Sequence, residues 1–107
     1  MANEKWVEAV GITDVPIDDV VRWDHEGISY AIYRLGGDEF FASSNICTHE
    51  HAYLSEGFLE DGVIECPRHS GRFDVRTGDP LGAPVCDAVK IFPVKVENGS
   101  VFVQVEG

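Results

Sequence analysis

The chain has 107 residues, 44% of them hydrophobic and 25% charged, and its 19 acidic and 8 basic residues give a net charge of −11. This length fits one domain with one core, and the composition is that of a globular chain and not of a disordered one. The acidic charge argues against nucleic acid and anionic membrane as partners, because both would repel it, whereas a basic protein surface would attract it.

The start of the chain and its apolar runs carry no targeting or membrane signal. Residues 1–6 lack the basic and apolar segments of a signal peptide. No apolar run approaches the ~18 residues that a membrane span needs. Three cysteines, an odd number, favour thiols over disulfides in the absence of such a signal. We therefore expect a cytoplasmic protein that is a monomer on its own.

The first 42 residues predict short strands separated by turns. Val, Ile, Phe and Tyr are frequent, and apolar and polar residues alternate with a partial period of two. No segment has the 3.6-residue period of an amphipathic helix. We predict one helical turn at most over residues 12–15, a hairpin at Gly36-Gly37, and strands over residues 6–10, 20–24, 28–34 and 39–42.

The last twenty residues predict a second hairpin. Residues 89–97 and 101–105 alternate well, and Val101, Val103 and Val105 share one face. Asn98-Gly99 between them is the strongest short-range hairpin signal in the chain. Since repeats and linkers are absent as well, we predict an all-β fold in a single domain over residues 1–107.

Residues 43–86, between these two halves, contain most of the cysteines and histidines of the chain. Cys47-Thr-His49 and Cys66-Pro-Arg-His69 form two pairs separated by sixteen residues. Thiolate and imidazole are the ligands of zinc, copper and iron–sulfur clusters. Short predicted strands at residues 63–65 and 72–75 would place each pair on a loop. We predict a metal site made of Cys47, His49, Cys66 and His69.

The distribution of these ligands bears on which metal binds. Zinc motifs commonly place Cys-x-x-Cys on one loop and two histidines on a helix. Here each loop offers one cysteine and one histidine, which suits two irons, one bound by both thiolates and the other by both imidazoles. A zinc-stabilised interaction module stays open as the structural alternative, whereas ordinary buried cysteines with surface histidines are the least favoured interpretation, because chance does not explain two such pairs well.

The stretch resembles the Rieske [2Fe–2S] motif, Cys-x-His followed after such a spacer by Cys-x-x-His. Nearly the whole chain resembles the Rieske-type ferredoxins of bacterial aromatic-ring dioxygenase systems, such as those for biphenyl, naphthalene and carbazole. The resemblance implies an antiparallel β-sandwich-like base with a small cluster-binding subdomain of two loops, over about residues 43–86. The flanking residues that match are Leu54-Ser-Glu-Gly57, Glu65-Cys-Pro67, Gly71, Phe73-Asp74, Thr77-Gly78 and Pro84.

The resemblance also implies roles. Cys47 and Cys66 would hold one iron of a single [2Fe–2S] cluster, His49 and His69 the other, and Pro84 would lie in a third, shielding loop. The function implied is that of a one-electron carrier, not an enzyme, which takes electrons from an NAD(P)H-dependent flavin reductase and delivers them to a terminal oxygenase.

Two further functions compete with that of an electron carrier. A terminal oxygenase would need a mononuclear iron with two histidines and a carboxylate. Only His25 and His51 remain after the cluster takes its ligands. A Rieske subunit of another redox assembly, such as the nitrite reductase small subunit, has the same ligands and stays open.

Four positions near the ligands predict a low reduction potential. High-potential respiratory Rieske proteins carry a disulfide between the two loops, and a Ser and a Tyr that donate hydrogen bonds. The corresponding residues here are Ala52 and Arg68, then Gly71 and Phe73, so neither the disulfide nor the two hydroxyl donors can be present. We expect a midpoint of about −150 mV, the low end of the Rieske range.

Charged residues around the two pairs suggest a docking surface that orients partners, with an ordinary solvated face as the alternative. The acidic members are Glu50, Glu56, Glu60, Asp61 and Glu65, and the basic ones are Arg68, Arg72 and Arg76, at intervals of four.

The other cysteine, histidine and aromatic residues that could have functional roles have simpler interpretations. We expect Cys86 to be a small buried residue, His51 a loop histidine and His25 part of a surface turn. Leu54 and Phe73 are candidates to cover the cluster. The aromatic residues predicted to pack in the core or on the sheets are Trp6, Trp23, Phe40, Phe41 and Phe92.

Overall fold

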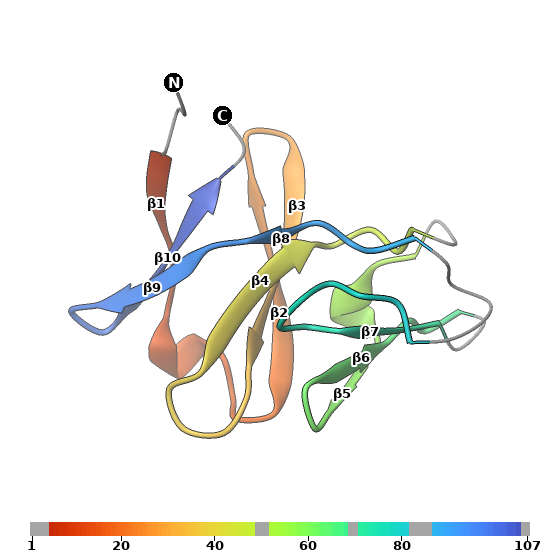
Figure 1. The fold of residues 1–107 in the computed structure, drawn as a ribbon. Coiled ribbons are helices and arrows are strands. Elements are labelled where there is room, and N and C mark those ends of the chain that lie inside the picture. The colour runs from red at the N-terminus through yellow and green to blue at the C-terminus, as the bar shows by residue number, and fades with distance from the viewer. Residues whose placement is uncertain (1–4, 49–51, 69–70, 82–86, 106–107) are drawn as a thin grey trace.

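The computed structural model describes residues 5–48, 52–68, 71–81 and 87–105. Within these ranges the chain forms ten strands and two single-turn 3-10 helices, and no α-helix. The strands make three antiparallel sheets (Figure 1). The predicted all-β class is confirmed. Among the described residues, no helix has the length and apolarity to cross a bilayer.

The first sheet joins the two ends of the chain. Its strands are β1 (Lys5–Gly11), β10 (Ser100–Val105) and β9 (Val94–Glu97), in the order β1-β10-β9. Asn98 and Gly99 connect β9 to β10 with φ of 51° and 78°. A two-residue hairpin loop with both φ angles positive matches the twist of its strands, so the predicted hairpin is confirmed.

The central sheet has the order β2-β3-β4-β8. Its strands are β2 (Asp19–His25), β3 (Ile28–Arg34), β4 (Phe40–Ser44) and β8 (Ile91–Phe92). The 3-10 turn η1 (Ile12–Asp14) precedes β2, as predicted. The predicted single strand over residues 89–97 is wrong, because it divides at Pro93 into β8, which pairs with β4, and β9, which pairs with β10. Proline donates no backbone hydrogen bond, so a ladder is readily interrupted there.

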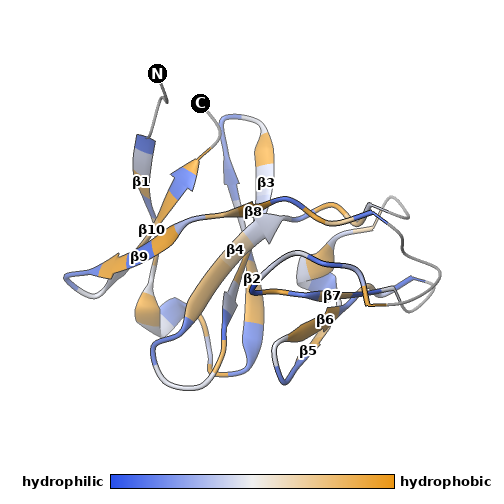
Figure 2. Ribbon diagram, in the orientation of Figure 1, coloured by the Kyte–Doolittle hydropathy of each residue, from blue (hydrophilic) through white to orange (hydrophobic). Residues whose placement is uncertain are grey.

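The third sheet is inserted between β4 and β8. It consists of β5 (Phe58–Glu60), β6 (Val63–Glu65) and β7 (Arg72–Asp74), and the 3-10 turn η2 (Leu54–Glu56) precedes it. Strand β5 was not predicted, because it forms by pairing with β6 and has no pattern of its own. Asp61 and Gly62, with φ of 52° and 77°, turn β5 into β6. Figure 2 shows hydrophilic residues at this turn and at the β9–β10 turn.

Strand β3 separates two hydrophobic cores, because its residues from Tyr30 to Tyr33 are all buried. On one face Tyr30 and Ile32 pack against the first sheet. The buried residues of this support core are Val15, Tyr30, Ile32, Phe40, Ala42, Phe92, Val101, Val103 and Val105, and the partly buried Val21 packs against them. On the other face Ala31 and Tyr33 pack toward the inserted sheet; this cysteine core comprises Val20, Ala31, Tyr33, Leu35, Cys47, Ala52, Leu54, Ile64, Cys66, Phe73, Val75 and Val89.

Candidate metal centre

Both cysteines of the predicted site begin loops that close in the same way. The amide of Cys47 donates to the carbonyl oxygen of Ala52 at 2.9 Å, and the amide of Cys66 donates to that of Gly71 at 2.6 Å. Each cysteine is therefore fixed by a backbone hydrogen bond to the residue five positions later. The sequence places His49 and His69 inside these two loops, and both lie outside the described residues.

The feet of the two loops are held by different structures. The second loop connects β6 to β7, whose ladder pairs Ile64 with Phe73 and Glu65 with Arg72. The first loop leaves the end of β4 and returns to η2, and its feet share a single bridge between Ile46 and Tyr53.

A third segment of the chain supports the first loop. The Thr48 hydroxyl donates to the carbonyl oxygen of Asp87 at 2.9 Å. The amide of Ser44 donates to that of Lys90 at 2.8 Å. Residues 87–90 therefore fasten the first loop from the side of the C-terminal half. No local pattern indicates this contact, because 39 residues separate Thr48 from Asp87. Pro84, assigned to a shielding loop, lies outside the described residues.

Both cysteines are buried in the cysteine core. Cys47 is 3% exposed and Cys66 1%, whereas the loop residues Thr48, Pro67 and Arg68 next to them are exposed. The site thus has an apolar inner side and a solvent-exposed outer side.

This donor set fits an iron–sulfur cluster. Thiolates are soft ligands and the normal anchors of such clusters. A thiolate is costly to bury among apolar side chains unless a cation binds it, and the iron of a cluster would supply that cation to both cysteines. Leu54 and Phe73 are fully buried in that core. Whether these two side chains cover the cluster stays a prediction.

Buried polar residues also surround the site, and sequence reasoning missed them. Ser43 and Asn45 are buried at the end of β4. The hydroxyls of Ser43 and Tyr33 form a hydrogen bond of 2.8 Å in which either can be the donor, and the Ser43 hydroxyl can also donate to the carbonyl oxygen of Ser44 at 2.9 Å. Burial raises the pKa of Tyr33 well above its ordinary value, and the hydrogen bond with Ser43 offsets part of this rise.

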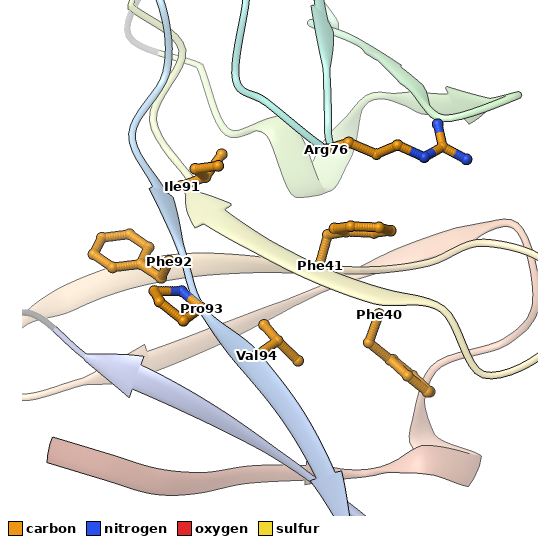
Figure 3. A pocket seen from close by; sticks show the side chains of 7 residues that line it. All are labelled: Phe40, Phe41, Arg76, Ile91, Phe92, Pro93 and Val94. Carbon is orange, nitrogen blue, oxygen red and sulfur yellow. The ribbon is translucent and has the colours of Figure 1, made fainter. Parts of the chain in front are cut away.

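The three arginines at intervals of four have different surroundings. Arg68 is exposed on the second loop. Arg72 lines a hollow of about 240 Å³ on the inserted sheet, beside the 67% exposed Phe58. Arg76 extends from the inserted segment over the ring of Phe41, with its guanidinium carbon 5.8 Å from the ring centroid (Figure 3). Arg76 therefore connects the inserted segment to the central sheet.

A second hollow, of about 410 Å³, lies at the edge of the central sheet, and of the two predicted ligands that the structure describes, Cys47 and Cys66, neither lines it. It is apolar apart from one arginine, and its lining residues are Phe40, Phe41, Arg76, Ile91, Phe92, Pro93 and Val94 (Figure 3). Its position separates it from the metal centre.

The remaining predicted residues have mixed outcomes. Phe40 and Phe92 are buried, and Trp23 packs against the support core, as expected. The prediction for His25 is wrong, because it is the last residue of β2 and half-buried, with its ring stacked on that of Trp23 at a centroid distance of 5.3 Å. Period-two alternation from Trp23 to His25 is the signal that could have shown this stacking. His51 and Cys86 lie outside the described residues.

Comparison with known proteins identifies the family. Residues 5–93 match the Rieske [2Fe-2S] domain. The chain belongs to this family. It is 46% identical over 101 residues to the ferredoxin component of the naphthalene 1,2-dioxygenase system of Pseudomonas aeruginosa, covering 94% of this chain and 96% of the relative. With the corresponding component of Pseudomonas putida it is 49% identical over 94 residues, covering 88% and 89%.

Solved structures agree. The ferredoxin fold in the complex of reduced oxygenase and oxidized ferredoxin in carbazole 1,9a-dioxygenase matches with a TM-score of 0.88 and 39% identity, covering 95% of this chain and 94% of that one. Two structures assigned as nitrite reductase small subunits match at 18% and 20% identity, which is a likeness of fold alone. The resemblance to Rieske-type ferredoxins is confirmed, and with it a [2Fe–2S] cofactor and the role of an electron carrier.

Proposed function

We propose that the protein carries single electrons from an NAD(P)H-dependent flavin reductase to a terminal aromatic-ring dioxygenase. The observation that carries this proposal is the pair of identically closed loops, each with its cysteine in the same apolar core and its neighbouring residues at the surface. A bound redox centre would be shielded on its inner side and accessible to a partner on its outer side. The solved complex of a similar ferredoxin with an oxygenase supports the acceptor.

We assign the ligands residue by residue. Cys47 and Cys66 would bind one iron of the cluster, and His49 and His69 the other, within a cluster-binding subdomain over residues 43–86 of a single Rieske domain spanning 1–107. Such a cluster supplies the reversible uptake of one electron. The protein's own part is to hold the two thiolates by the backbone bonds at Ala52 and Gly71, and to keep water from them with the cysteine core.

Metal analysis and turnover test this function. The purified protein should contain two irons and two sulfides and show a visible absorption band and a dithionite-dependent EPR signal. Zinc without sulfide would instead support the interaction module. Addition of the reductase and oxygenase components of a naphthalene dioxygenase system should give oxygenated product in proportion to the amount of this protein. Turnover with a nitrite reductase and not with the oxygenase would support the other Rieske assembly.

The reduction potential gives an independent test. The residues at the hydroxyl-donor positions, Gly71 and Phe73, are both buried and have no side-chain donor. Loss of such donors leaves the charge on the sulfurs less stabilised, so the midpoint should lie at about −150 mV. A redox titration with a midpoint above zero would contradict this expectation.

The exposed Arg68 offers a test of docking. Exchange of Arg68 for Leu should slow electron transfer to a partner that presents an acidic group to this position, and the effect should shrink as salt is added. An unchanged rate at low salt would remove Arg68 from the docking surface.

We also propose that the protein is a cytoplasmic monomer when no partner is bound. Thiolate ligands persist in a reducing compartment. Light scattering coupled to size exclusion would report the mass in solution, and fractionation of the producing cell would report the compartment.

A further inference from the structure

Asn45, the residue after the end of β4, is a fully buried polar residue whose side-chain nitrogen, side-chain oxygen, backbone amide and carbonyl oxygen each make a hydrogen bond. It is 0% exposed. Its side-chain Nδ2 donates to the Ser29 hydroxyl at 3.0 Å, and its Oδ1 accepts from the amide of Ser55 at 2.8 Å. Its own amide donates to the carbonyl oxygen of Ser29 at 3.0 Å, and its carbonyl oxygen accepts from Leu54 at 2.7 Å.

These four bonds join three separate parts of the molecule. Ser29 belongs to β3, the strand that is buried on both faces. Leu54 and Ser55 belong to η2, where the first loop returns. Asn45 itself stands two residues before Cys47, where the loop departs. The side chain therefore ties the departing and returning ends of the first loop to each other and to the middle of the fold.

The second loop shows why such a tie is needed. Its two feet are strands, and the β6–β7 ladder sets their separation before Cys66 is reached. The first loop has one bridge, Ile46 with Tyr53, in place of a ladder. A side chain with a donor and an acceptor on one planar group can supply the missing cross-links, and asparagine has this geometry.

We propose that Asn45 is the positioning residue of the first ligand loop. Its amide group sets the separation of the loop's two feet, and so fixes Cys47 against Cys66 for the metal that both would bind. The inference rests on the proposed ligand role of Cys47. It adds the Asn45 side chain as an outer group, one that positions this ligand without contacting the metal. Outer groups of this kind commonly change metal retention without touching the metal.

Three variants test the proposal. Asn45→Leu keeps the branched shape and the number of side-chain heavy atoms and removes both side-chain bonds, and Ser29→Ala removes the hydroxyl partner alone. Ser43→Ala is the matched control, because Ser43 is 1% exposed and lies two residues away. The side-chain bonds of Ser43 go to Tyr33 and to Ser44, so they stay within β3 and β4.

The rate of cluster loss, followed as visible absorbance in the presence of an iron chelator, should rise about ten-fold in Asn45→Leu. It should rise by a smaller factor in Ser29→Ala and stay at the wild-type rate in Ser43→Ala. The EPR spectrum of Asn45→Leu should shift, since the geometry at the first thiolate changes. Hydrogen exchange measured by mass spectrometry should accelerate in the peptide around Cys47 and stay unchanged in the peptide around Cys66.

Wild-type cluster retention, spectrum and loop exchange in Asn45→Leu, together with lowered stability, would overturn the proposal and make Asn45 a packing residue. If Asn45→Leu does not fold, Ser29→Ala decides: an unchanged rate of cluster loss and unchanged exchange around Cys47 overturn the proposal. Failure of the proposed function would show separately, as a wild-type protein without iron and sulfide.

Discussion

The two faces of strand β3 lead into cores of different character. Tyr30 and Ile32 enter the support core, which consists of valines, aromatic rings and other apolar side chains. Ala31 and Tyr33 enter the cysteine core, which contains both thiols and borders the buried Ser43. One strand thus packs against the support core on one side and against the two candidate ligand cysteines on the other. We therefore expect the same amino-acid substitution to affect the cluster differently on the two faces of β3.

The largest effect should come from removing a thiol. Cys66→Ala takes one ligand from the cysteine core and leaves the support core intact, so iron, sulfide and visible absorption should fall to background. Hydrogen exchange of β10 should remain slow, because its valines pack on the other face of β3. Retention of two irons and two sulfides by Cys66→Ala would contradict the ligand assignment.

A matched pair of isoleucines separates stability from cluster retention. Ile32 and Ile64 are both 0% exposed, the first in the support core and the second in the cysteine core. Truncation of either to Ala should lower the free energy of unfolding by about 2–5 kcal/mol, because each leaves a cavity. Chemical denaturation measures this loss. The rate of cluster loss should rise in Ile64→Ala alone, and equal rates in both variants would remove the distinction between the cores.

Two glycines, one in the inserted segment and one in the central sheet's hairpin, allow a comparison of the backbone in these two regions. A Cβ at Gly57 would collide with the carbonyl oxygen of Glu65, whereas a Cβ at Gly36 meets open space. Gly57→Ala should therefore push β5 from β6 and lower the free energy of unfolding by about 1–3 kcal/mol. Gly36→Ala, in the hairpin between β3 and β4, should change it by less than about 0.5 kcal/mol. Similar thermal midpoints for the two variants would show that β5 can shift freely.

The smallest effect concerns alkaline pH and Tyr33. Burial raises the pKa of this phenol, so the folded state keeps its proton where the unfolded state releases it. The stability that this gives is complete below the ordinary tyrosine value of about 10 and falls as pH rises toward the folded value, by up to about 1.4 kcal/mol per unit. Urea unfolding at pH 8 and pH 11 should show a smaller alkaline loss in Tyr33→Phe than in the wild type. Equal losses in the two proteins would place the alkaline sensitivity elsewhere.

Local patterns predicted most of the strands and both hairpins. The strands at residues 28–34 and 63–65 have the predicted limits, and Asn98-Gly99 turns as expected. The division at Pro93 was missed, since it depends on β4 and β10 being the neighbours on either side. Strand β5 was missed because it exists by pairing with β6 and has no pattern of its own.

The candidate site shows the same limit. Four candidate ligands of two types at a fixed spacing predict a metal centre, because coordination chemistry selects thiolate and imidazole wherever they lie in a fold. Asn45 was not predicted, since an asparagine before a loop is ordinary turn chemistry until its partners are known. Those partners, Ser29 and Ser55, stand 16 and 10 residues away in the sequence.

Neighbouring residues and a short motif were enough to predict the all-β class and the Rieske family, which are confirmed, and the set of four ligands, which stays a prediction. The tertiary structure alone decided that three sheets form, that β3 is buried on both faces, and that Arg68, Arg72 and Arg76 have different surroundings. The physical reason is that burial and side-chain hydrogen bonds join residues far apart in the chain, and the free energy of such contacts appears when all the partners are in place.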